Sequence, residues 1–351
     1  MTATAPSIIQ FDLPPNLACP KPTEERKIKR DEVRLLVTTK SGSIGHTIFN
    51  HLTTFLKEGD VLVVNTSATI PSALPILLPN DKKGKLHFST KLNDKQWLVE
   101  IREITGNKTK RWKEGKEEMV FHLPTLTAIT LKQKFYKNDK WLDLWIAEFN
   151  NDLHVENYLE AFARPIQYEH LEKQYPLSYY QTFFSFHPGS SEMPSAGRGF
   201  TPGLIERLLK KGIVIVPVLL HTGVSSLEEY ETPYPEYMEI DPVAAAVINT
   251  AKRENRRIIG VGTTVVRAVE SAANEQAIVT PSQGKTELFI DENYSMKIIN
   301  GLLTGFHEPK ATHLNMLQAI AGYGHIERAY HAAIEGGYYW HQFGDLHLIL
   351  P

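Results

Sequence analysis

The stretch from residue 257 to 317 constrains the fold more than any other part of the chain, because it links apolar runs to polar turns. Its first run, Ile258–Val261, is short and β-branched, which predicts a buried strand. Residues 265–273 then predict a helix, and three residues join the two: Gly262, Thr263 and Thr264. A helix start leaves unpaired N–H groups and a partial positive charge, so this junction predicts a seat for an anion. Arg267 adds a fixed charge one helical turn further along.

A second polar junction, Phe306 to Lys310, ends another strand-like run. Pro309 suits the first turn of a helix, so we expect a helix to begin there. Two such junctions predict one polar cleft at the carboxyl ends of neighbouring strands. The cleft is predicted to contain Thr263, Thr264, Arg267, His307 and Lys310. Helix capping alone is the alternative, since Gly and Thr are common at helix starts and the Gly-x-Gly-x-x-Gly spacing of dinucleotide folds is missing.

The pattern of apolar and polar residues changes near residue 76 and again near residue 150. Between residues 76 and 150, short alternating or β-branched segments separated by turns predict an antiparallel sheet or small barrel. On either side, continuous apolar runs at 60–65 and 213–220 alternate with capped helical segments, which is typical of α/β folds. We therefore expect an α/β domain, a mixed sheet with flanking helices, formed by residues 1–75 and 151–351 and interrupted by an inserted, barrel-like antiparallel β domain at 76–150.

Charge and cysteine content exclude several classes of protein. With 38 Lys and Arg against 40 Asp and Glu, the net charge of −2 excludes a globally basic nucleic-acid binder. Two local basic segments, 21–34 and 102–116, are interpreted either as solvated surface or as elements that face RNA. The single Cys19 excludes an internal disulfide and a multi-cysteine metal site.

The sequence also bears on location and assembly. The first ten residues lack the basic start and apolar core of a signal peptide, and no run reaches transmembrane length. We therefore expect a cytoplasmic protein with no membrane partner, as a monomer or weak homodimer. No cluster of metal ligands stands out, so we expect no metal.

Four motifs in the C-terminal part carry a resemblance to a known family: GVGTTVVRAVESA, TELFI, LLTGFHEPKATHLNML and FGDLHLIL. The chain resembles the S-adenosylmethionine:tRNA ribosyltransferase-isomerase family of queuosine biosynthesis, most closely over 257–350. Members transfer the ribosyl part of S-adenosylmethionine to a 7-aminomethyl-7-deazaguanine base of tRNA, giving epoxyqueuosine, adenine and methionine. The resemblance implies S-adenosylmethionine as the ribosyl-donor substrate and a tRNA anticodon stem-loop as partner.

The resemblance and the junctions together predict the site residues. His307 is the first candidate for proton transfer and His221 the second, while Lys310 is expected to balance negative charge or hold a phosphate. Aromatic residues of 179–186 are expected to stack on a base. Residues expected to bind substrate are Gly262, Thr263, Thr264, Arg267, Phe306, Gly197, Arg198, Phe200, Asn65 and Asp345.

Several positions depart from the family pattern. Ala68 and Ala73 stand where the family has arginine, and Gly199 and Tyr234 stand where it has histidine. Arg198 is new, but arginine cannot act as a base as histidine does. Three readings therefore stay open: the ribosyltransferase-isomerase itself, a paralogue that uses S-adenosylmethionine on another nucleoside or small molecule, and a non-catalytic tRNA-binding relative. The polar cleft favours an enzyme over a binding module.

Overall fold

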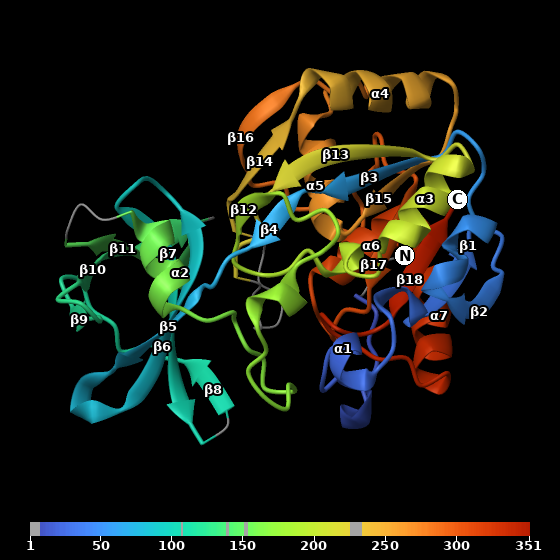
Figure 1. The fold of residues 1–351 in the computed structure, drawn as a ribbon. Helices are drawn as coiled ribbons and strands as arrows, with labels where there is room; N and C mark the ends of the chain where they lie inside the picture. Colours follow the sequence, from blue (N-terminus) through green and yellow to red (C-terminus); the bar gives the residue numbers. More distant parts are fainter. Residues whose placement is uncertain (1–7, 107, 138–139, 151–153, 225–233) are drawn as a thin grey trace, which may run out of the picture.

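The computed structural model describes residues 8–106, 108–137, 140–150, 154–224 and 234–351. Within them the chain forms a nine-stranded mixed sheet and a seven-stranded antiparallel sheet, on the right and left of Figure 1. A short parallel pair, β4 (Ser67–Thr69) with β12 (His187–Ser190), lies between them. The mixed sheet with its helices and the second, antiparallel sheet confirm the predicted fold class. Short helical pieces are α1 (Thr23–Arg26) and 3₁₀ turns at Pro15–Leu17, Arg30–Glu32, Phe49–Thr54, Pro79–Asp81, Leu177–Tyr180 and Ser195–Gly197.

Four parallel strands form the centre of the large sheet. In spatial order they are β13 (Val214–Leu220), β3 (Val61–Asn65), β15 (Ile258–Val261) and β17 (Gly301–Gly305). The outer strands are β14 (Glu236–Ile240) and β16 (Ser282–Thr286) beyond β13, and β18 (Leu346–Leu350), β1 (Arg34–Thr39) and β2 (Ile44–Ile48) beyond β17. Strands from both ends of the chain therefore pair within one sheet.

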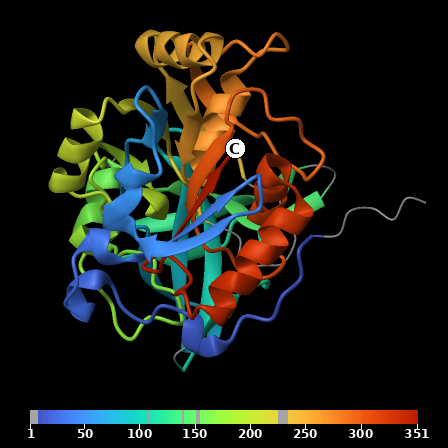
Figure 2. The same cartoon turned by 90° about the vertical axis from the view of Figure 1, so that its right-hand side faces the viewer.

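Both faces of the large sheet are covered, which explains the uninterrupted apolar sequence of its central strands. Along β3, Val61 and Val63 belong to one core, whereas Leu62 and Val64 belong to the other. The helices of the first core are α4 (Pro242–Arg253), α5 (Thr263–Ala272), α6 (His313–Ala321) and α7 (Tyr323–Glu335), and that of the second is α3 (Pro202–Lys210). Figure 2 shows α3 and α7 on opposite sides of the sheet.

The antiparallel sheet has its own core of large side chains, including Phe88, Trp97 and Trp145. Helix α2 (Val155–Phe162) contributes buried residues such as Leu159 to the same core. That core spans a wider range than 76–150, and the position of the domain boundaries stays a prediction. The strands are β5 (Ala73–Leu77), β6 (Lys83–Lys91), β7 (Gln96–Thr105), β8 (Lys108–Arg111), β9 (Val120–His122), β10 (Ala128–Lys137) and β11 (Lys140–Phe149).

The basic segment 102–116 is partly buried. Arg102 and Arg111 donate hydrogen bonds of 3.0 and 2.6 Å to Oε1 of Glu100, and all three side chains are buried. Trp112 is buried as well. The interpretation that these arginines and the tryptophan face RNA is therefore wrong, because they stabilise the interior. The exposed lysines of the segment are Lys108, Lys110, Lys113 and Lys116.

The helix expected at Pro309 begins later, at His313. Lys310 has a φ of 64°, in the left-handed region, so the chain turns here and cannot continue as a right-handed helix. The predicted helix start is therefore wrong. The strand before it is present as β17, and its parallel pairing with β15 confirms that both polar junctions leave neighbouring strands at one edge.

Gly199 packs where no side chain fits. An added Cβ would lie 2.7 Å from Cδ1 of Phe49 and 3.1 Å from Cδ1 of Leu346, and both of these side chains are buried. We expect Gly199→Ala to lower the free energy of unfolding by about 1–3 kcal/mol, the usual cost of overpacking a core, in urea denaturation. The control is Gly203→Ala in α3, where the nearest atom to the new Cβ is 3.8 Å away. Equal stability of the two variants would contradict the tight packing at residue 199.

Candidate active site

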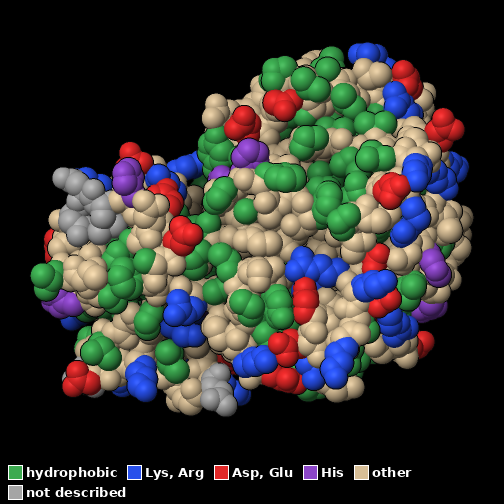
Figure 3. Space-filling model, in the orientation of Figure 1, with side chains coloured by type: hydrophobic (Ala, Val, Ile, Leu, Met, Phe, Trp, Pro, Cys, Tyr) green, Lys and Arg blue, Asp and Glu red, His purple; other side chains and the backbone are tan. Residues whose placement is uncertain are grey.

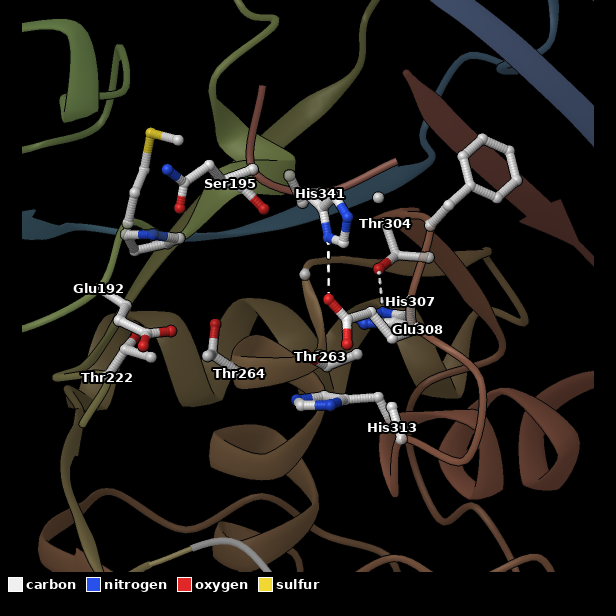
Figure 4. Close-up of a pocket in the computed structure, with 18 of the residues that line it drawn as sticks. Glu192, Ser195, Thr222, Thr263, Thr264, Thr304, His307, Glu308, His313 and His341 are labelled. Carbon is white, nitrogen blue, oxygen red and sulfur yellow. Dashed lines mark hydrogen bonds and ion pairs between the residues drawn. The ribbon is translucent and has the colours of Figure 1, made fainter. Parts of the chain in front are cut away.

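A cavity of about 210 Å³ opens at the carboxyl edge of β15 and β17. Its walls come from the loop 192–196, the start of α5, parts of the segment 304–313, and His341 with Gln342. The remaining lining residues are Tyr168, His170 and Thr222. Figure 4 shows Glu192, Thr222 and Thr264 on one side of this cavity and His307, Glu308 and His313 on the other.

The start of α5 forms one wall of the cavity. Gly262 precedes the helix with a φ of 97°, which glycine adopts freely, and as the N-cap residue it has no side chain to cap the first turn. The helix therefore presents unpaired N–H groups and its partial positive charge at this wall. Nδ2 of Asn65 donates to the carbonyl of Leu220 at 2.8 Å and to Oγ1 of Thr264 at 3.3 Å, which holds Thr264 in place. This arrangement suits a carboxylate or a phosphate.

His307 is fixed by contacts on several sides. The ring atom Nε2 lies 3.0 Å from Oγ1 of Thr304. The backbone N–H of His307 donates to the hydroxyl of Tyr330 at 3.2 Å, and its backbone carbonyl accepts from Nε1 of Trp340 at 3.0 Å. The ring stacks on that of His313, with 4.7 Å between centroids and 2° between planes. Burial holds the pKa of His307 well below its usual range and lowers that of His313 to about 4. Both imidazoles are therefore neutral at pH 7 and retain a lone pair.

A second stacked pair, His170 and His341, was not predicted from the sequence. The two rings lie 4.1 Å apart at 16°, and Nδ1 of His341 lies 3.2 Å from Oε1 of Glu308. Burial lowers the pKa of His170 to about 3 and that of His341 to about 4, and it raises the pKa of Glu308. Neither histidine belongs to a strand-to-helix junction, so the search for polar residues at such junctions could not identify them.

A sequence profile described as "Queuosine biosynthesis protein" matches residues 7–349. The chain belongs to this family. The S-adenosylmethionine:tRNA ribosyltransferase-isomerase of Desulfitobacterium hafniense is 35% identical over 352 residues, which cover 97% of this chain and 98% of the relative. The protein of the same name from Carboxydothermus hydrogenoformans is 34% identical over 349 residues, with the same coverage of both chains.

A solved structure of the family agrees with the fold. The crystal structure of S-adenosylmethionine tRNA ribosyltransferase from Thermotoga maritima matches with a TM-score of 0.54 and 26% identity. The match covers 98% of this chain and 100% of that one. The family and the architecture predicted from the sequence are thus confirmed over nearly the whole length.

Five of the predicted site residues of this family member line the cavity: Gly262, Thr263, Thr264, Phe306 and His307. Asn65 does not line the cavity, but it donates a hydrogen bond to the side chain of Thr264, which does. The structure places Arg267 and Lys310 outside the cavity lining, so the expectation that five residues of the two junctions share one cleft holds for three of them.

Arg267 is engaged within the protein. Its guanidinium pairs with the carboxylate of Glu236, and it donates to the carbonyls of Leu288 at 3.0 Å and Tyr234 at 3.3 Å. Both members of the ion pair are buried. The charge that was expected to hold a substrate anion therefore neutralises an internal carboxylate instead.

Other predicted residues lie behind or beside the cavity. Arg198 is buried and pairs with Glu24 at 2.5 Å. Gly197, which precedes it at the end of a 3₁₀ turn, is buried as well. Phe200 is buried in the core and contacts Phe49 edge to face, so it does not stack on a ligand there.

His221 and Asp345 also have internal partners. His221 places Nδ1 2.8 Å from Oγ of Ser67 and stacks on Tyr237. Asp345 accepts from the backbone N–H groups of Arg34 and Tyr339, both at 2.8 Å. The aromatic segment 179–186 contributes no residue to the lining. Tyr180 and Phe184 are buried in cores, whereas Phe183 and Phe186 are exposed.

The positions where this chain departs from the family carry no charge into the cavity. Ala68 and Ala73 are buried. Tyr234 is buried as well, and its hydroxyl accepts from Nη2 of Arg111 at 3.3 Å. Within the described residues, no three His, Cys, Asp or Glu side chains are arranged to hold a metal ion. None of the helices in the described part of the chain has the length and apolar character needed to span a membrane.

Removal of Arg267 should affect folding first. Arg267→Met leaves the buried carboxylate of Glu236 without its charge partner, so we expect the free energy of unfolding to fall by about 3–5 kcal/mol. The double variant with Glu236→Gln should recover most of this loss, because no unpaired charge remains. Urea denaturation of both proteins measures the difference. A single variant as stable as the double one would contradict the role of the ion pair.

The buried histidines also predict how stability depends on pH. In the unfolded chain their pKa is about 6.5, whereas burial depresses it in the folded protein to about 4 for His313 and His341. Below pH 6.5 the unfolded state therefore binds more protons, so stability is full above 6.5 and falls as the pH drops toward 4. Each histidine contributes a slope of up to about 1.4 kcal/mol per pH unit.

Denaturation of wild type and His313→Phe at pH 7.5 and pH 5 isolates this contribution from that of the carboxylates. We expect the loss of stability between the two pH values to be smaller in His313→Phe. His331→Phe, which changes an exposed histidine of α7, should match wild type. An identical loss in all three proteins would refute the prediction.

Proposed function

We propose that this chain is an S-adenosylmethionine:tRNA ribosyltransferase-isomerase. It transfers and isomerises the ribosyl part of S-adenosylmethionine onto the 7-aminomethyl-7-deazaguanine base of tRNA, giving epoxyqueuosine and releasing adenine and methionine. The observation that carries the proposal is the cavity at the edge of β15 and β17, where an open helix start meets neutral imidazoles in a chain of this family. The names of the relatives from D. hafniense and C. hydrogenoformans support it.

The chemistry of the substrates matches the cavity walls. S-adenosylmethionine carries a carboxylate and a positively charged sulfonium. The start of α5, with Thr263 and Thr264, offers N–H groups and hydroxyls to the carboxylate or to an RNA phosphate. Glu192 and Glu308 line the cavity and offer negative charge to the sulfonium.

The reaction also needs groups that move protons. The acceptor amine loses a proton when its nitrogen bonds to the ribosyl carbon, and departing adenine gains one. His307, neutral and in hydrogen-bond reach of Thr304, is the proton-transfer group that we assign first. Lys310 and His221 lie outside the lining and are assigned no contact with substrate.

We further propose the anticodon stem-loop as the part of tRNA that binds, and the cytoplasm as the compartment. An overall charge of −2, with basic and acidic side chains interspersed on the face drawn in Figure 3, leaves RNA binding to local basic surface, such as the exposed lysines of 108–116. The paralogue and the non-catalytic relative would both fail to release adenine with tRNA that carries the 7-deazaguanine base, and this separates them from the proposal.

Adenine release from S-adenosylmethionine tests the proposal. Wild type should release adenine when tRNA bearing the aminomethyl base is present, and His307→Ala should lower kcat by about 10²–10⁴-fold with little change in KM. His331→Ala, on the exposed face of α7, is the control and should retain full activity. Full activity of His307→Ala would remove it from the mechanism. Tight binding of S-adenosylmethionine by wild type without adenine release would favour the paralogue.

A further inference from the structure

The turn that carries His341 is held in a constrained conformation. His341 has a φ of 71°, which is unusual for a residue other than glycine, and its carbonyl accepts from the N–H of Gly344 at 2.9 Å. A Cβ on Gly344 would lie 2.4 Å from the carbonyl oxygen of Tyr339, so the turn closes only with glycine. Asp345 anchors the turn by accepting from the N–H of Tyr339. Backbone strain of this kind persists where the surroundings impose it and is concentrated at functional sites.

The side chain of His341 is fixed as firmly as its backbone. One ring face stacks on His170 at 4.1 Å, and Nδ1 lies 3.2 Å from Oε1 of Glu308, as the dashed line in Figure 4 shows. The His341 side chain is 15% exposed and that of Glu308 is 47% exposed, so the pair lies at the cavity wall and remains accessible. Glu308 and His170 are the titratable groups that contact His341 from other segments.

The contact with Glu308 decides which ring nitrogen is free. A carboxylate 3.2 Å from Nδ1 favours a hydrogen on that nitrogen, and this is the tautomer in which Nε2 keeps its lone pair. Burial lowers the pKa of His341 to about 4, so Nε2 is unprotonated at pH 7 and can accept a proton. Glu308 then stabilises the imidazolium that forms.

A small second void lies beside the turn that carries His341. It is lined by Gly199, Arg198 and Asp345 together with His341. Gly199 itself has no room for a side chain, because Phe49 and Leu346 occupy the space.

We infer that His341, oriented by Glu308 and held by His170, is a second proton acceptor of the cavity, acting on the acceptor amine. The inference rests on the proposed function. As the amine nitrogen bonds to the ribosyl carbon, the bond from that carbon to the sulfonium sulfur breaks and its electron pair leaves with sulfur as methionine. An N–H bond of the amine breaks at the same time, and its electron pair stays on nitrogen. The proton moves to Nε2 of His341, and the resulting imidazolium later passes it to solvent or to departing adenine.

Kinetics of four variants test the assignment. His341→Phe keeps a flat ring against His170 but removes the proton acceptor, so kcat for adenine release should fall by about 10²–10⁴-fold with KM nearly unchanged. Glu308→Gln removes the carboxylate that orients His341 and its negative charge at the cavity wall, whereas His170→Phe removes only the imidazole on which His341 stacks. Each should lower kcat by about 10–100-fold. His331→Phe, on the exposed face of α7, serves as the matched control and should behave as wild type.

A spectroscopic readout is independent of turnover. Long-range ¹H–¹⁵N spectra should show His341 in the Nδ1–H tautomer at pH 7. In Glu308→Gln the pKa of His341 should fall further, because the carboxylate that stabilises the imidazolium is gone, while the thermal unfolding midpoint stays close to that of wild type.

The two proposals fail in different ways. If wild type releases adenine and His341→Phe releases it equally fast, the inference about His341 is overturned and the proposed function stands. An Nε2–H tautomer in wild type would overturn the inference as well. If wild type releases no adenine under any condition, the proposed function fails, and with it the role of His341 toward the amine.

Discussion

The parallel pairing of β15 with β3 and β17 is the constraint on which the site depends. Because both faces of these strands are buried, polar side chains can emerge only at the strand ends. The N–H of Gly262 donates to the carbonyl of Leu303 at 2.8 Å, which extends the ladder into the turn before α5. This bond fixes the distance between the open helix start and the segment that carries His307. The pairing of the strands therefore sets the position of the cavity, and the side chains at the strand ends set its chemical character.

Burial determines the electrostatics of the cavity. His307 stacks on His313, and His170 stacks on His341, and burial keeps all four imidazoles neutral at pH 7. Neutral rings can accept protons without first losing one, and the low local dielectric strengthens each interaction with a charged substrate group. The carboxylates of Glu192 and Glu308 line the same cavity as these imidazoles.

Two buried arginines, unlike the neutral histidines of the cavity, keep their charge and pair with carboxylates. Arg267 pairs with Glu236, and Arg198 pairs with Glu24, in both cases with the guanidinium buried. A buried charge without a partner is costly, so each arginine is committed to the carboxylate that neutralises it. These pairs hold strand β14 against α5 and the N-terminal segment against the loop before α3. Positive charge is consequently used for structure, while the helix start of α5 supplies it to the cavity.

Local sequence alone determined the family and most of the elements, although not the start of the helix after Pro309. The strand and helix around Gly262 and the motifs of the C-terminal part follow from residue types at short spacing. The same holds for the starts of α3 and α4, where the side chains of Thr201 and Asp241 accept from backbone N–H groups of the first turn. Tertiary structure alone decided which side chains line the cavity. His170 and His341 are 171 positions apart (341 − 170) and are brought together only when the C-terminal turn packs on the loop after α2. Whether Arg267 faces a ligand or a carboxylate likewise depends on where Glu236 lies in space, which residue spacing does not encode.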